Sequence, residues 1–263
     1  MDASPPWLAA LLNCAETAAP RAYVPFSEAP VGAALLLTDG HWIPGVRVES
    51  ASFSLTLPAL HNAFTTAVAL QATARIVGVA CSRPVRPEEA TYLEGLSVPL
   101  TPTTDRVWHV HGRHGPEQIG DPLSPLLEAA PVDDAAGRAL ARRVAERAYV
   151  PASAFPVGAV LETTNGWVSG VNVEHPDWAR ILCAERNALG TARSYGLHPA
   201  DRLYLTCLRD PHGSPCGACR QWLVEHAPQA TVIMDRGDDS AVHQAAVPDL
   251  LPDSFNGRTM LNA

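Results

Sequence analysis

The stretch Tyr149–Ala159 reads YVPASAFPVGA, and an earlier stretch, Tyr23–Ala33, reads YVPFSEAPVGA. Each stretch runs into an apolar segment, which predicts a buried strand. A pair of residues typical of a tight hairpin follows in each case, Asp39–Gly40 in the first and Asn165–Gly166 in the second. The same order of elements at a nearly constant spacing indicates two copies of one α/β unit.

The flanking sequence extends this order in both directions. Helices are predicted before the repeated stretches, over residues 7–19 and 134–148, and another helix over residues 58–74. A strand is predicted over residues 75–81, after the last of these helices.

Residues 112–133 are rich in Gly, Pro and acidic side chains, which is typical of a linker. We therefore expect one domain over residues 1–128 and a second over residues 129–263.

The composition excludes several classes of protein. The chain has 263 residues, of which 47% are hydrophobic, so a sizeable core can form without disulfide bonds. The net charge is −8 and there is no basic run, which excludes a nucleic-acid partner. All 19 basic residues are arginine, so lysine Schiff-base chemistry is excluded. A signal sequence and a membrane-length apolar run are both missing, so we expect a cytoplasmic protein with no membrane partner.

Cysteines and a glutamate gather in the stretch from Cys183 to Cys219. The first cluster reads CAERNA, starting at Cys183, and the second reads PCGAC, ending at Cys219. Thiolates suit Zn²⁺, and three protein ligands leave a fourth position for water, as in catalytic zinc sites. Glu185 follows the first cysteine closely enough to move protons without binding the metal. We predict that Cys183, Cys216 and Cys219 are zinc ligands and that Glu185 is the catalytic residue.

Both clusters precede segments with a helical pattern, and helix N-termini lower the pKa of thiols. Because three thiolates leave the zinc site negatively charged, we expect Arg186 and Arg220 to donate hydrogen bonds to the sulfurs. Zinc lowers the pKa of water towards neutrality. Glu185 is expected to accept that proton and pass it to the substrate's ring nitrogen and then to the leaving amine.

The repeat provides an internal control for this site. In the aligned first copy, the positions of the glutamate and the cysteines are held by other residues: Pro58, Leu60, Glu88 and Thr91. If the cysteines only packed a core, small apolar residues would be expected in their place, whereas two of the replacements are polar. We therefore predict one catalytic site, in the second copy, and a degenerate first copy.

The second copy resembles the cytidine deaminase family in five stretches: 149–159, 170–174, 183–188, 215–221 and 250–255. The likeness covers most of residues 134–256, and a weaker likeness covers about residues 8–128. The resemblance implies a zinc-dependent hydrolase that acts on the C–N bond of a cyclic amidine. The implied reaction converts cytidine or deoxycytidine to uridine or deoxyuridine with release of ammonia, a step of pyrimidine salvage.

The same resemblance assigns residues to a small-molecule nucleoside. Asn172 and Glu174 match the N-x-E pair that binds the ribose hydroxyls, and Phe155 matches the aromatic residue beside the base. The backbone around Ala184 is expected to hold the pyrimidine carbonyl.

For the architecture, the resemblance implies an α/β fold of two tandem three-layer α/β/α units, each with a mixed sheet of about five strands. It further implies a homodimer that imitates a tetramer and holds two zinc sites. A segment around Phe255 is expected to close a neighbouring pocket.

Two departures from the family border the predicted substrate pocket. Residues 175–178 read HPDW where the family usually reads NASY, and Ala152 stands where Tyr or Phe is common. Another aminopyrimidine nucleoside is therefore an alternative substrate. An alternative of a different class is a non-catalytic structural zinc protein, although such a site does not need Glu185 and normally has a fourth protein ligand. A polynucleotide editor is disfavoured by the net charge of −8.

Overall fold

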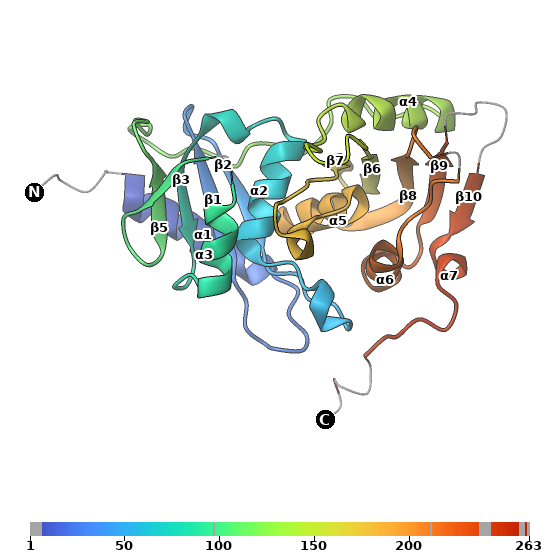
Figure 1. Cartoon of the computed structure of the whole chain (residues 1–263), viewed down its shortest axis with the longest axis horizontal. Helices are drawn as coiled ribbons and strands as arrows, with labels where there is room; N and C mark the ends of the chain where they lie inside the picture. Colours follow the sequence, from blue (N-terminus) through green and yellow to red (C-terminus); the bar gives the residue numbers. More distant parts are fainter. Residues whose placement is uncertain (1–6, 97, 211, 237–242, 258–260, 262–263) are drawn as a thin grey trace, which may run out of the picture.

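The computed structural model describes residues 7–96, 98–210, 212–236, 243–257 and 261, and the chain forms two α/β units that lie side by side (Figure 1). In chain order the first unit, drawn in blue to green, consists of α1 (Trp7–Ala18), η1 (Ala19–Arg21), β1 (Gly32–Leu37), β2 (Trp42–Val46), η2 (Phe53–Leu55), α2 (Ala59–Ala69), η3 (Thr73–Arg75), β3 (Ile76–Cys81), α3 (Pro87–Glu94), β4 (Leu100–Pro102) and β5 (Val107–Val110). Here η denotes a 3₁₀ turn.

The second unit repeats the opening order of the first. It consists of α4 (Asp134–Ala145), β6 (Gly158–Thr163), β7 (Gly166–Val171), η4 (Trp178–Arg180), α5 (Ala184–Ser194), β8 (Pro199–Thr206), α6 (Gly217–His226), β9 (Thr231–Asp235), β10 (His243–Ala246) and α7 (Val247–Leu250). Among the described residues, every helix is too short or too polar to span a lipid bilayer.

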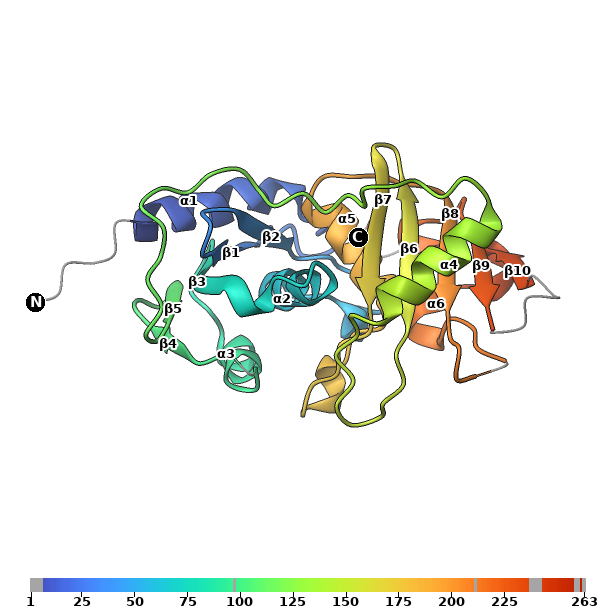
Figure 2. The same cartoon turned by 90° about the horizontal axis from the view of Figure 1, so that it is seen from above.

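Each unit is a sheet covered by helices on both faces, as predicted. In the first unit α1 and α2 lie on opposite faces of the sheet, and in the second α4 lies opposite α5 and α6 (Figures 1 and 2). The strand β1 shows why: all of its residues are buried, and they alternate between two apolar clusters. Ala34 and Leu36 join the cluster that contains α1, while Ala33 and Leu35 join the cluster that contains α2.

Both sheets have five strands, but only the second is mixed. Its order is β10-β9-β8-β6-β7, and β8 and β9 are parallel because α6 crosses between them. The first sheet has the order β2-β1-β3-β5-β4, and each neighbouring pair in it is antiparallel. There α3 leads to β4 at the outer edge, and β5 turns back beside β3. The prediction of a mixed sheet is therefore confirmed for the second unit and wrong for the first.

The predicted helix over residues 58–74 is shorter in the structure. α2 ends at Ala69, and Gln71 adopts a positive φ of 54°, which a continuing right-handed helix does not permit. A separate 3₁₀ turn, η3, covers the three residues directly before β3.

The two units meet through α2 and α5, which pack against each other. Thr66 and Thr191 hold equal positions in the two copies, and their hydroxyl oxygens are 2.9 Å apart. Nδ2 of Asn62 donates to the carbonyl oxygen of Gly190 at 3.1 Å and to that of Val46 at 2.9 Å. One hydrophobic cluster runs without interruption from α1 in the first unit to α6 in the second. The two units therefore share a core.

Candidate active site

The three predicted zinc ligands come together at the starts of two helices. Cys183 is the N-cap residue of α5, Cys216 is the N-cap residue of α6, and Cys219 lies in the first turn of α6. Their sulfur atoms all lie within 4.8 Å of one another, and the Sγ atoms of Cys183 and Cys216 are 3.8 Å apart. Folding thus brings together the two clusters that the sequence separates.

The spacing of the sulfurs fits a single zinc ion. With a Zn–S bond of about 2.3 Å and tetrahedral angles, two thiolate ligands lie about 3.8 Å apart. The distance between Cys183 and Cys216 matches this value. Among the described residues, this is the one group of three or more metal-ligating side chains close enough to share an ion. The donor set of three thiolates is one that zinc favours.

Gly170 on β7 allows α5 to approach the sheet at this point. A Cβ atom at Gly170 would lie 2.2 Å from the carbonyl oxygen of Ala184, so any larger residue would push the helix start away. Ala184 is itself fully buried. The backbone around Ala184 therefore lies beside the cysteine cluster, where the resemblance places the pyrimidine carbonyl.

Hydrogen bonds among the three cysteine thiols shift their pKa values in opposite directions. Hydrogen bonds from Cys183 and then Cys219 lower the pKa of the Cys216 thiol. The hydrogen bond to Cys216 raises the pKa of the Cys183 thiol, and hydrogen bonds to Cys183 and then to Cys216 raise the pKa of the Cys219 thiol. Thiols that bind zinc do so as thiolates, so metal binding at this cluster releases protons.

The Glu185 side chain lies in the first turn of α5 and is only 4% exposed. Burial raises the pKa of its carboxyl to about 7, and the negative charge of Cys216 acts in the same direction. A hydrogen bond from the Cys219 thiol acts in the opposite direction, which places the carboxyl at the cysteine cluster. A carboxyl that titrates near neutral pH can both accept and release a proton there.

Arg186 and Arg220 have other hydrogen-bond partners in this structure, and their predicted role at the cysteine sulfurs stays a prediction. Among the described residues, their hydrogen bonds go to oxygen atoms and none goes to a cysteine sulfur. Arg186 donates to the carbonyl oxygen of Leu55 at 3.1 Å, and its guanidinium lies 5.2 Å from the centre of the Trp222 ring. Arg220 donates to the carbonyl oxygen of Pro215 at 2.8 Å. Arg220 thus fixes the loop before α6, and Arg186 fixes a contact with the first unit.

The predicted substrate residues Asn172 and Glu174 bond the backbone of the loop that carries Phe155. Oδ1 of Asn172 accepts from the backbone N–H of Val157 at 2.8 Å, and its Nδ2 donates to the carbonyl oxygen of Phe155 at 2.9 Å. The Glu174 carboxylate accepts from the backbone N–H of Ala152 at 2.7 Å. In this structure both side chains hold the loop that carries Phe155, and their binding of ribose stays a prediction.

A segment of the first unit that was not predicted for the site lies against both zinc-site helices. The carbonyl oxygen of Leu55 accepts from Arg186 and from Nε1 of Trp222, each at 3.1 Å. Nearby, Ser50 Oγ donates to Oε1 of Glu225 on α6 at 2.8 Å. The sequence carried one signal for this segment, because residues 50–53 read SASF and keep more of the family pattern than their counterparts in the second copy.

The counterpart loop, residues 175–178, turns towards the first unit. The His175 ring stacks on Tyr92 of α3, with centroids 5.1 Å apart and an interplanar angle of 24°. Nε2 of His175 lies 3.4 Å from the carbonyl oxygen of Tyr92. In this structure the His175 side chain contacts α3 of the first unit, and an influence of residues 175–178 on the substrate stays a prediction.

The first-unit residues that align with the three cysteines have other surroundings. Pro58 has no ligand atom, and Glu88 is exposed. Oγ1 of Thr91 donates to the carbonyl oxygen of Pro87 at 3.1 Å. That this copy lacks a metal site stays a prediction.

Comparison with known proteins links both units to one family. A family model described as "Cytidine and deoxycytidylate deaminase zinc-binding region" matches residues 133–235, and a second model with the same description matches residues 3–81. Cytidine deaminase of Mycobacterium tuberculosis is 39% identical over 122 residues, which are 45% of this chain and 86% of the relative. Cytidine deaminase of Mycoplasma genitalium is 33% identical over 113 residues, which are 43% of this chain and 87% of the relative.

Solved structures of similar proteins carry the same name. The crystal structure of cytidine deaminase from Burkholderia pseudomallei is 37% identical, with a TM-score of 0.42, and covers 46% of this chain and 98% of that chain. That of Mycobacterium leprae is 28% identical, with a TM-score of 0.39, and covers 46% of this chain and 99% of that chain.

Proposed function

Because the chain belongs to the cytidine deaminase family, we propose that it removes the amino group of cytidine and deoxycytidine by hydrolysis. The products are uridine or deoxyuridine and ammonia, a reaction of pyrimidine salvage. The observation that carries the proposal is the meeting of three cysteine sulfurs within 4.8 Å of one another beside a buried carboxyl.

The zinc site is assigned to Cys183, Cys216 and Cys219, and a zinc ion bound there supplies a Lewis acid that lowers the pKa of water. Glu185 accepts a proton from the attacking water at a carboxylate oxygen. It then delivers protons to ring nitrogen N3 and to the departing amine. Water adds to C4 and the exocyclic C–N bond breaks, so one water is consumed and one ammonia is released.

Phe155, Asn172, Glu174 and the backbone of Ala184 are assigned to the nucleoside. Asn172 and Glu174 alternate along an extended segment, so their side chains leave it on the same side. The Glu174 carboxylate keeps lone pairs beyond those used by the loop, and these can accept from a ribose hydroxyl.

A substrate panel tests this assignment. We expect cytidine and deoxycytidine to be turned over with a kcat/KM at least roughly tenfold above that of free cytosine, because cytosine has no sugar for Asn172 and Glu174 to bind. Ammonia release measured at a fixed enzyme concentration checks this. Equal turnover of cytosine and cytidine would show that the two residues do not bind the sugar.

A modified aminopyrimidine nucleoside is the second candidate substrate. Ala152 is exposed beside Glu174 and leaves room where an aromatic side chain is common in the family. The same panel, extended to nucleosides with substituents on the base, distinguishes the candidates. Efficient cytidine turnover favours the first, and turnover confined to a modified nucleoside favours the second.

The proposal also assigns different roles to the two copies. We assign residues 129–263 to the catalytic zinc-binding domain and residues 1–128 to a non-catalytic domain. The support is that the first copy has Pro58, Glu88 and Thr91 at the ligand positions, while its η2 segment packs on the zinc-site helices.

We also propose that two chains form a homodimer. Phe53 and Trp178 hold equal positions in the two copies, and their side chains are 86% and 85% exposed. Aromatic residues are more frequent at protein–protein interfaces than on the rest of the protein surface. We expect light scattering to give twice the chain mass for the wild type and the single-chain mass for Phe53→Ser with Trp178→Ser. A wild-type protein with the mass of one chain at micromolar concentration would refute the dimer.

A cytoplasmic location is the last element of the proposal. All six cysteines are free in the structure, which is typical of a reducing compartment. Cell fractionation that recovers the protein outside the cytosol would contradict it.

A further inference from the structure

The two units meet at two junctions that the repeat makes equivalent. At the first, Nη1 of Arg21 donates to the carbonyl oxygen of Ser194 at 3.1 Å. At the second, Nη1 of Arg147, the counterpart of Arg21, donates to the carbonyl oxygen of Ala69 at 3.1 Å. The backbone is therefore arranged in the same way at both junctions. Differences between the junctions come from their side chains.

Each junction contains a tyrosine at an equivalent position of the repeat. Tyr23 accepts at its carbonyl oxygen from the N–H of Glu49 at 2.8 Å, and Tyr149 does the same with Glu174 at 2.8 Å. The two rings are thus presented from matched backbone positions. Their surroundings differ: Tyr23 is partly buried, whereas Tyr149 is 46% exposed.

The first junction is filled by planar nitrogen-containing groups. The Arg193 guanidinium lies 5.2 Å from the centre of the Tyr23 ring. The His226 imidazole packs edge-on against the same ring, with centroids 5.0 Å apart. Both contacts are favourable on an aromatic ring.

The second junction lacks both groups and is hollow. Val68 stands at the position of Arg193, and α3 ends at Glu94, before Val98, which aligns with His226. A cavity of about 410 Å³ remains, lined by Tyr149, Val68 and Phe64, among others, and by none of the three cysteines. A volume of this size suits a small molecule.

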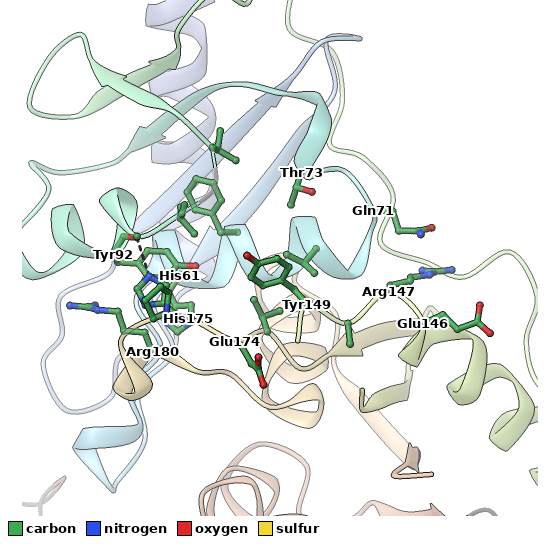
Figure 3. A pocket seen from close by; sticks show the side chains of 18 residues that line it. His61, Gln71, Thr73, Tyr92, Glu146, Arg147, Tyr149, Glu174, His175 and Arg180 are labelled. Carbon is green, nitrogen blue, oxygen red and sulfur yellow. Dashed lines mark hydrogen bonds between the residues drawn. The ribbon is translucent and has the colours of Figure 1, made fainter. Parts of the chain in front are cut away.

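The walls of this junction cavity indicate the class of ligand. Figure 3 shows Tyr149 reaching into it, with His61, Tyr92 and His175 grouped on one side and Glu146 and Arg147 on the other. Phe64, Val98 and Val173 supply apolar surface, and Gln71 and Thr73 supply hydrogen-bonding groups: this combination accommodates a flat ring with polar substituents.

The charges around the cavity favour a neutral ligand. Glu146 and Glu174 are balanced by Arg147 and Arg180. Nε of Arg180 is already paired with Asp177 at 3.0 Å, and the Glu174 carboxylate is already bonded to backbone N–H groups. The two acidic and two basic side chains on the walls thus leave the cavity lining without a net charge that would select an anion or a cation.

We propose that the junction cavity binds a neutral, planar nitrogen heterocycle, a nucleobase or its nucleoside, stacked on Tyr149 in place of the groups that cover Tyr23. This second binding site contains none of the three cysteines and does not depend on zinc chemistry, and Glu174 is the one wall residue that it shares with the proposed deaminase site. The proposal therefore stands or falls separately from the proposed deaminase activity.

Equilibrium dialysis with radiolabelled uridine, comparing the wild type with Val68→Arg, tests the proposal. The substitution gives the second junction the arginine that covers Tyr23 in the first, so it should fill the cavity. If uridine also binds at the cysteine cluster, we expect two bound molecules per wild-type chain and one per variant chain. If it does not, we expect one and none. An equal number bound by the two proteins would overturn the proposal.

A second pair of variants keeps the test decisive if Val68→Arg misfolds. Tyr149→Leu removes the stacking surface, whereas Tyr149→Phe keeps the ring and removes only the hydroxyl group. We expect at least a tenfold weaker uridine affinity at this site for Tyr149→Leu and near wild-type affinity for Tyr149→Phe. Equal affinity in the two variants would exclude stacking on Tyr149 and overturn the proposal.

Discussion

Glu185→Gln is expected to abolish deamination while zinc stays bound. Removing a positioned general acid–base group lowers turnover by about 10²–10⁴-fold, and the amide of glutamine cannot carry the proton. The three cysteine ligands are unchanged, and the glutamine side chain has nearly the volume of glutamate. Ammonia release gives the loss of activity, and metal analysis of the same sample gives the zinc content.

Glu88→Gln is the matched control for this substitution. It makes the same chemical change in the first copy, at the degenerate position that aligns with Cys216. Activity and zinc content should both stay at the wild-type level. Full activity in Glu185→Gln, with zinc retained, would remove Glu185 from the mechanism.

Residues 129–263 produced alone are expected to bind zinc poorly and to lose activity by roughly tenfold or more, because the shared core would be exposed to water. Leu182 and Leu189 lie in one buried cluster with Leu57 of the first unit. The fragment would also lose the Leu55 carbonyl that accepts from Arg186 and Trp222 on the zinc-site helices. Zinc analysis and ammonia release of the purified fragment measure the two losses, and light scattering gives its state of association.

Addition of residues 1–128 provides the control for the truncation. If the first copy acts by completing the shared core, mixing the two separately produced fragments should restore part of the zinc binding and activity. A monomeric fragment of residues 129–263 with full activity would show instead that the first copy is dispensable for the site.

Much of the fold could be predicted from local patterns. The repeated YVP…PVGA stretch and the hairpin turns after it are short-range signals, and the elements that they predict are present in both units. The order of strands after α3 could not be predicted in this way. Whether β5 runs parallel or antiparallel to β3 depends on where β4 lies in the sheet, and the strand sequences themselves do not encode that position.

The candidate site was predictable to the extent that its chemistry is local. Cys183 and Glu185 are near neighbours at one helix start, and Cys216 and Cys219 share another, so their spacing already indicated a metal site. The partners of Arg186 were not predictable, because a long guanidinium side chain bonds whichever acceptor the tertiary structure brings close. Here that acceptor belongs to the other copy.

The junction cavity illustrates the same limit. Val68 takes the position of Arg193 in the first copy, which is an ordinary change within a helix. Only comparison of the surroundings of Tyr149 with those of Tyr23 shows that this change leaves a cavity. A repeat within one chain supplies this comparison, because each copy shows what the other lacks.

The number of zinc ions bound per full-length chain tests the central claim most directly. One catalytic copy and one degenerate copy predict one zinc ion per chain in the wild type, none in Cys216→Ser, and one in Glu88→Gln. Two zinc ions per wild-type chain, or one retained in Cys216→Ser, would contradict the assignment of a single site to the second copy.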